Sequence, residues 1–418
     1  MSSRKVALFD QPIPQNDVVS KDFYDCNPLT VITDTNLEFR VEGTRFNYID
    51  LNDTLLHLKI KFTLPDAYAA AGDSIPCFFE NLPIASLFSD VSLYLNGNLI
   101  EGGDSLYPYK AYLHSLLETD VVDKGTRMCS WGYGTDAKRK SMMDKDSFEM
   151  ELVGPLFLDF FRQKEYLFPL VDVHIRLTRN DPKFYLRTES GTLPWSVSIE
   201  KAILKVKKVQ MNSEIYHNHS QGLLKQPVLY PIQRSIMMKQ TIPAGSTDYR
   251  YELPEMSPKL IITALVDSEI SFAKNPFYFD HFKLNRFIVT TNGKMKIFEP
   301  DFENKLCVNE YMLLYQTFPA LCGITPDDFI SGYTLFVTNL CPDGDMNEVQ
   351  EKKPIDMRME LRFAEPLKQN VSLIVMAICD EGIVIDKNFQ VRRMKGFETA
   401  FHGKYKRIPK LTRTNLLQ

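Results

Sequence analysis

The order of predicted elements in this chain occurs twice, and this repeat constrains the fold more than any other feature of the sequence. A strand that runs into Asn96–Gly97 is followed by a second strand and by a helix predicted over Tyr107–Glu118. The same succession returns at Asn292–Gly293, with a helix predicted over Val308–Thr317. Asn-Gly between such runs is typical of a tight β-hairpin, because both turn residues must adopt positive φ. The sequence therefore predicts tandem copies of one unit.

The remaining strands support the same repeat. The strand predicted over Pro169–Leu177, in which apolar and polar residues alternate from Val171 onward, has its counterpart in Pro354–Leu361, and a long strand closes each copy. Strict alternation places the apolar side chains on one face of a half-buried strand. The segment 46–64 is predicted to form two strands that meet at Asn52–Asp53. Many short strands with turn residues between them are typical of β-sandwiches. The two closing strands are predicted over Val197–Met211 and Val371–Ile385.

Length and composition fit two domains of a globular protein. The chain has 418 residues, of which 44% are hydrophobic and 24% charged, and this is enough apolar material for two cores. Aromatic residues reach 12%, which favours strands. The predicted organisation is an N-terminal arm over residues 1–35, a first sandwich over 36–211, a linker over 212–235, a second sandwich over 236–386 and a basic tail over 387–418.

The tail differs in charge from the rest of the chain. The whole sequence has a formal net charge of −4, whereas the tail has nine Lys and Arg residues and a single acid, Glu398. A cationic tail on an acidic body could hold DNA through phosphate contacts, and it could equally clamp an acidic neighbouring subunit or remain solvated. We expect it to face the interior of an assembly. The candidate contact residues are Arg392, Arg393, Lys395, Lys404, Lys406, Arg407, Lys410 and Arg413.

Motifs that carry chemistry are incomplete. The segment 134–141 lacks the glycine that precedes lysine in a phosphate loop, and 343–354 lacks the glycine and the final glutamate of a calcium loop. His217 and His219 have no third ligand at suitable spacing, and the seven cysteines form no CxxC pair. We therefore predict no catalytic, metal or cofactor site and no enzyme. No apolar run approaches the length of a membrane span, and scattered cysteines are typical of an intracellular protein.

Three segments carry a resemblance to a known family, and they are 43–52 (GTRFNYIDLN), 88–97 (FSDVSLYLNG) and 107–113 (YPYKAYL). They resemble the major capsid protein of Polinton (Maverick) elements and adintoviruses, which is related to the shell proteins of virophages. The resemblance spans most of residues 36–390. It implies an all-β fold of two tandem eight-stranded antiparallel jelly rolls, with a few short helices in the loops.

The same resemblance implies an assembly and its partners. In that family, homotrimers with a pseudo-hexagonal outline tile an icosahedral shell around double-stranded DNA, and pentamers of a single jelly-roll protein fill the vertices. The expected location is the virion capsid, assembled in the host cytoplasm or nucleus. Six similar barrels around a threefold axis give a tile with nearly equivalent edges, which a closed shell requires.

Subunit contacts are expected in the long aromatic-rich insertions 102–147 and 299–328. Trp131, Tyr133, Tyr311 and Tyr315 are the candidates for the trimer interface, and local packing within the chain is the alternative for each.

Two other functions stay open at this point. A double jelly-roll hydrolase acting on glycans would need a carboxylate cluster in a cleft between the domains, and it would be a monomer. An array of carbohydrate-binding modules would expose tryptophans, of which the chain has only Trp131 and Trp195.

Overall fold

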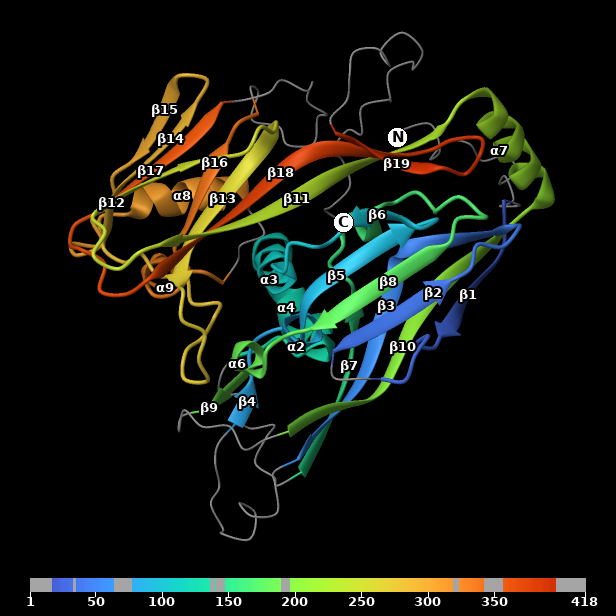
Figure 1. Ribbon diagram of the computed structural model, residues 1–418, viewed down its shortest axis with the longest axis horizontal. Coiled ribbons are helices and arrows are strands. Elements are labelled where there is room, and N and C mark those ends of the chain that lie inside the picture. Colours follow the sequence, from blue (N-terminus) through green and yellow to red (C-terminus); the bar gives the residue numbers. More distant parts are fainter. Residues whose placement is uncertain are drawn as a thin grey trace, which may run out of the picture.

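Two β-sandwiches lie side by side in the computed structural model (Figure 1), which describes residues 17–32, 35–63, 77–135, 139, 147–188, 196–318, 323–341 and 356–395. Every strand pairing among these residues is antiparallel, apart from one isolated bridge between Phe279 and Tyr333. None of the helices within these ranges is long and apolar enough to cross a membrane.

The first jelly roll consists of two four-stranded sheets. Their strand orders are β1-β10-β3-β7 and β2-β8-β5-β6. A short additional pair, β4 (Cys77–Phe79) and β9 (Leu186–Thr188), lies outside these sheets. The strands are β1 (Val18–Cys26), β2 (Asn36–Val41), β3 (Asn47–Thr63), β5 (Phe88–Leu95), β6 (Asn98–Glu101), β7 (Ser147–Pro155), β8 (Val173–Arg179) and β10 (Ser196–Met211).

The second jelly roll has the same construction. Its strand orders are β11-β18-β13-β16 and β12-β17-β14-β15, and a further strand, β19 (Val391–Lys395), pairs with β18. The other strands are β11 (Val228–Ile242), β12 (Asp248–Glu252), β13 (Pro258–Asp267), β14 (Leu284–Thr291), β15 (Lys294–Phe298), β16 (Leu335–Asn339), β17 (Met357–Phe363) and β18 (Val371–Ile385).

The two sets of strands correspond one to one. When β1, β3, β7 and β10 are replaced by β11, β13, β16 and β18, the order of the first sheet becomes that of its counterpart, and the other two sheets correspond in the same way. Eight strands in two facing four-stranded sheets form each unit. The predicted fold class, a tandem pair of jelly rolls, is therefore confirmed.

Two helices occupy equivalent positions in the repeat. Helix α3 (Tyr107–Glu118) lies between β6 and β7, and helix α8 (Val308–Thr317) lies between β15 and β16, both with the predicted bounds. The other helices are short or lie in connections: α2 (Pro83–Ser86), α4 (Val121–Gly125), η2 (Arg127–Trp131), η3 (Asp159–Arg162), α6 (Pro182–Tyr185), α7 (Ser213–Lys225) and α9 (Pro326–Ile330).

The predicted Asn-Gly turns form as expected. Asn96 and Gly97 have φ of 46° and 80°, and Asn292 and Gly293 have φ of 45° and 78°. Positive φ at both central residues matches the twist of the flanking strands in a two-residue hairpin. The turns connect β5 to β6 and β14 to β15.

The predicted break at Asn52–Asp53 is wrong, because β3 is one strand of 17 residues. Its pairing with β10 is irregular at that point, where Lys205 pairs with Leu55 and Lys207 pairs with Asp50. The turn-forming residues are therefore accommodated as a bulge, which leaves extra residues unpaired without ending the strand.

Segments that the sequence analysis placed outside the sandwiches contribute elements to them. Within 212–235, the Asn212 side chain caps α7 and β11 begins at Val228. Pro231 lies inside β11, which is an edge strand and so tolerates a residue without an N–H. Strand β1 from the arm pairs with β10, and β19 from the tail pairs with β18.

Candidate functional site: the junction of the two jelly rolls

Helix α3 belongs to the first jelly roll in sequence but packs into the core of the second. Its residues from Tyr107 to Leu117 are all buried. The Tyr112 ring stacks on Phe277 with 4.3 Å between centroids, and Tyr109 meets Phe184 edge-on at 5.5 Å. Tyr109, Tyr112 and four other residues of α3 or just before it join the same apolar cluster as the second jelly roll, and the four are Leu106, Leu113, Leu116 and Leu117. The helix therefore fixes one jelly roll against the other.

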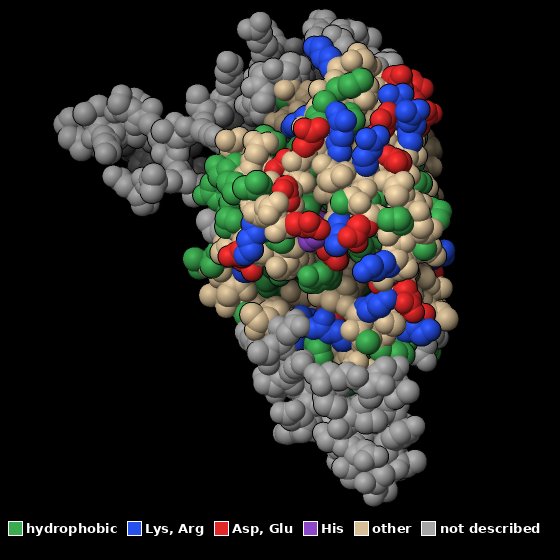
Figure 2. Space-filling model, turned by 90° about the vertical axis from the view of Figure 1, so that its left-hand side faces the viewer, with side chains coloured by type: hydrophobic (Ala, Val, Ile, Leu, Met, Phe, Trp, Pro, Cys, Tyr) green, Lys and Arg blue, Asp and Glu red, His purple; other side chains and the backbone are tan. Residues whose placement is uncertain are grey.

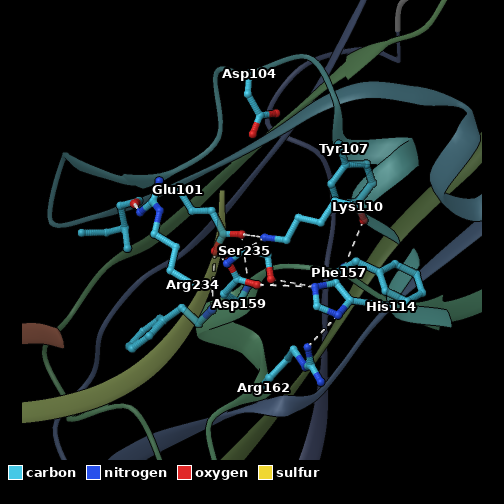
Figure 3. A network of polar contacts seen from close by, with 12 residues as sticks. Glu101, Asp104, Tyr107, Lys110, His114, Phe157, Asp159, Arg162, Arg234 and Ser235 are labelled. Carbon is cyan, nitrogen blue, oxygen red and sulfur yellow. Dashed lines mark hydrogen bonds and ion pairs between the residues drawn. The ribbon is translucent and has the colours of Figure 1, made fainter. Parts of the chain in front are cut away.

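A buried ion cluster lies on the polar side of this helix (Figure 3). The Lys110 ammonium contacts the Glu101 carboxylate and lies 2.8 Å from Asp159 Oδ2. The side chains of Lys110, Glu101 and Asp159 are 6%, 9% and 0% exposed. The Glu101 carboxylate also accepts hydrogen bonds from the backbone N–H of Asp159 at 2.9 and 3.0 Å. Asp159 Oδ2 accepts another from the backbone N–H of Ser235, on β11, at 2.8 Å.

The electrostatics of this cluster follow from burial and proximity. Burial, together with the nearby Asp159 charge, raises the pKa of Glu101. Burial alone would lower the pKa of Lys110, but the charges of Asp159 and Glu101 outweigh it and raise that pKa. The ammonium therefore stays charged at neutral pH. It compensates two carboxylates that would otherwise be costly to bury.

His114, one helical turn beyond Lys110, continues the network toward the surface. Its Nε2 lies 2.9 Å from the Ser235 hydroxyl, and its Nδ1 lies 3.0 Å from both Glu118 and Arg162. Arg162 also contacts the Glu118 carboxylate. Burial would raise the pKa of Glu118, but the charges of and hydrogen bonds to His114 and Arg162 lower it to about 2. This arrangement connects α3, η3 and β11.

The N-terminal half of strand β11 makes hydrogen bonds to the first jelly roll. The Arg234 guanidinium donates to the Ile100 carbonyl at 2.9 Å, and the Gln163 amide donates to the Pro231 carbonyl at 2.6 Å. The Tyr230 hydroxyl accepts from the Phe168 N–H at 2.9 Å and donates to the Tyr166 carbonyl at 3.1 Å. The two jelly rolls are therefore joined by directional hydrogen bonds as well as by apolar packing.

A cavity of ≈180 Å³ lies beside the ion cluster. Its polar lining includes Asp90, Glu101, Asp104, Lys110 and Arg234. This is the kind of place where a glycan hydrolase would need its carboxylates. However, Glu101 already accepts from Lys110 and from a backbone N–H, so its oxygens are engaged within the protein. The Asp90 carboxylate likewise accepts from the backbone N–H of Gly103 at 2.7 Å. The geometry supports a structural role for these acids.

The four candidates for the trimer interface lie in different environments. Trp131 is 7% exposed and packs edge-on against Phe157 with centroids 6.0 Å apart. Tyr133 is partly buried and packs against both cores. Tyr311 is also partly buried and donates to the Ile324 carbonyl at 3.0 Å, whereas Tyr315, one turn away on α8, is 39% exposed.

Of the basic tail candidates, Arg392 and Arg393 lie on β19, and Lys395 is its last residue. Arg393 Nε lies 3.4 Å from the Glu381 carboxylate. The rest of the tail set lies outside the described residues: Lys404, Lys406, Arg407, Lys410 and Arg413. Trp195, which the carbohydrate-binding alternative would need on the surface, also lies outside them. Within the described ranges, no group of three or more His, Cys, Asp or Glu could hold a metal ion.

Sequence reasoning missed the ion cluster, although it left a signal. Lys110, His114 and Glu118 stand four residues apart in a helix that is otherwise mostly apolar. Residues at this spacing share one face of a helix. A charged stripe along such a helix indicates a buried polar partner, which here is the pair Glu101 and Asp159.

No protein-family model and no curated protein matches the chain. Solved structures do. A chain of the Sputnik virophage structure matches with a TM-score of 0.68 and 12% identity, over 99% of this chain and 96% of that one. The PBCV-1 virus capsid matches at 0.60 and 11%, over 92% and 98%. The mavirus major capsid protein matches at 0.53 and 10%, over 99% and 96%. The chain has the double jelly-roll fold of these capsid proteins.

Proposed function

We propose that this chain is the major structural subunit of a viral-type capsid. The observation that carries the proposal is the extent of the structural match. It covers nearly all of this chain and nearly all of the Sputnik and mavirus chains, so it includes both jelly rolls. A likeness confined to one jelly roll would support far less, because that fold serves many functions.

The proposed assembly is a homotrimer with a pseudo-hexagonal outline. Each chain supplies two equivalent jelly rolls, so three chains supply six similar barrels around one axis. The buried ion cluster at Lys110 and the apolar packing of α3 hold the two barrels of one chain in a fixed relation. A rigid relation of this kind suits a tile that must meet identical neighbours on every side.

We further propose that the trimers form an icosahedral shell around double-stranded DNA, with a single jelly-roll penton protein at the vertices and the virion as the location. The resemblance of segments 43–52, 88–97 and 107–113 to Polinton and adintovirus capsid proteins supports this finer assignment.

The size of the full-length protein in solution tests the proposal. Sedimentation velocity should give a particle of three times the 48.3-kDa chain, and negative-stain images should show six-sided outlines and closed shells. A stable monomer would contradict the proposal, and one that cleaves glycans would favour the hydrolase instead.

The basic tail is proposed to face the shell interior and to contact packaged DNA. Truncation after Lys395 keeps β19, which pairs with β18, and removes the basic residues that follow it. The shortened protein should form particles that hold less DNA or that dissociate at lower salt. Particles unchanged in both respects would contradict a contact role for the tail.

A further inference from the structure

The repeat places α3 and α8 in equivalent positions, but their surroundings differ. Helix α3 is buried along nearly its whole length because the second jelly roll covers it. On α8, only Glu310 and Leu314 are buried. The apolar residues exposed on α8 or just before it are Leu306 (67%), Val308 (55%), Met312 (40%) and Tyr315 (39%).

The surface that covers α3 also has an equivalent. Strand β11, which contacts α3 through Ser235, is the edge strand that pairs with β18 along its whole length, starting at Val228 opposite Ile385. Its counterpart β1 is the edge strand that pairs with the C-terminal half of β10, starting at Val18 opposite Met211. Strand β1 is largely exposed and carries Val19 (63%), Phe23 (54%) and Tyr24 (52%) on the surface.

From this comparison, and on the basis of the proposed function, we propose that the exposed face of α8 binds β1 of a second copy of the chain. The contact between copies repeats the contact that joins the two jelly rolls within one copy. Each chain then carries one half of the contact on its second jelly roll and the other half on its first. Such a head-to-tail contact closes a ring when the rotation between copies is suitable.

The surroundings of α8 are continuous with the contact inside the chain. Gly323, in the loop before α9, lies close to the first jelly roll. If this residue carried a Cβ atom, that atom would lie 3.6 Å from Cγ2 of Val121 on α4. Val121 and Val122 are themselves 47% and 72% exposed. Figure 2 views the end of the molecule formed by the second jelly roll, where hydrophobic side chains gather along the left margin of the described surface. Gly323, which follows α8 in the chain, therefore lies next to the first jelly roll.

Charge at the margins also fits a contact between the two surfaces. The Lys207 and Lys208 ammonium groups lie over the rings of Phe23 and Tyr24, at 5.5 and 4.2 Å from their centroids. Lys207 also pairs with Asp53. Beside α8, the side chains of Glu303 and Asp327 are 72% and 80% exposed, and Asp327 pairs with Lys305. Each margin therefore carries exposed charged groups of both signs. Opposite charges at an interface rim favour the correct pairing of surfaces.

Two variants of the full-length protein test the contact, Met312→Lys on α8 and Phe23→Lys on β1. Each should sediment as a monomer, because each lacks one half of the contact. An equimolar mixture should give dimers that grow no further, because only the α8 of Phe23→Lys and the β1 of Met312→Lys remain intact. Leu99→Lys, which replaces a residue 51% exposed on β6, is the matched control and should remain trimeric. Circular dichroism should show the same fold for all three variants.

Trimers in either variant, or a mixture that stays monomeric, would overturn the contact and leave the proposed function standing. A wild-type protein that does not assemble at all would overturn the proposed function, and this contact with it.

Discussion

Asn96 and Asp172 hold each other through two hydrogen bonds. The Asn96 N–H donates to the Asp172 carbonyl at 3.0 Å, and the Asp172 N–H donates to the Asn96 side-chain oxygen at 2.7 Å. Asn292 and Asp356 make the same pair of bonds at 3.0 and 3.1 Å. The pair fixes each Asn-Gly hairpin to the start of the neighbouring strand, β8 or β17. Its recurrence shows that the repeat extends to individual side chains.

Replacing Asn96 by Ala should lower the free energy of unfolding by about 2 kcal/mol. The change removes the bond to Asp172 and a second one to the Phe389 carbonyl at 2.8 Å, and it places alanine at positive φ. Urea unfolding at a fixed protein concentration measures the loss. Asn96→Gly separates the two causes, because glycine tolerates this φ but restores neither bond. Equal stability of Asn96→Ala and wild type would show that the pair contributes nothing.

Replacing Lys110 by Met should destabilise the protein by about 3–5 kcal/mol. The variant leaves Glu101 and Asp159 buried without their cation, and an uncompensated buried charge is costly. Lys59→Met is the matched control, because its pair with Glu149 is exposed to solvent and should contribute little to the free energy of unfolding. Urea unfolding of both variants makes the comparison. Similar small losses in the two would contradict the role assigned to the cluster.

The Glu118 carboxylate should make stability depend on pH in the acid range. Its pKa is about 2 in the folded protein, against an ordinary value of 4.5. A lowered pKa stabilises the fold above the ordinary value, and that stabilisation is lost as the pH falls from about 4.5 toward 2. Glu118→Gln should therefore be less stable than wild type by about 3 kcal/mol at pH 7. The difference should disappear near pH 2. A difference that stays constant with pH would contradict this assignment.

Replacing Trp131 by Ala should affect the stability of the fold, whereas replacing Tyr315 by Ala should affect the trimer. Trp131 is buried within its own chain, so Trp131→Ala should lower the free energy of unfolding by about 3 kcal/mol through the cavity it leaves. Tyr315 is partly exposed on α8, so Tyr315→Ala should leave unfolding nearly unchanged and weaken the trimer. Unfolding and sedimentation measured on both variants would distinguish these effects. The opposite pattern would place Trp131, rather than Tyr315, between subunits.

Elements with a strong local pattern could be predicted from the sequence. The bounds of α3 and α8, both Asn-Gly hairpins and the long strands β10 and β18 follow from periodicity and turn chemistry. Predictions failed where the pairing between strands decides the local structure. The bulge in β3 depends on β10 across the sheet, and Pro231 lies in a strand only because that strand is at an edge.

The ion cluster could not be predicted in full for the same reason. Its members come from β6, α3, η3 and β11, which meet only in the folded chain. The stripe of Lys110, His114 and Glu118 shows which helix face is polar, but its partners Asp159 and Ser235 stand in segments without a recognisable pattern.

The position of α3 also means that the two jelly rolls, although they repeat one fold, depend on each other for their apolar packing. The helix starts in one jelly roll and completes the apolar interior of the other, where Tyr112 covers Phe277 and lies near Phe279. A second jelly roll made without the first would leave those rings facing water. The two halves, similar as they are, should therefore unfold together.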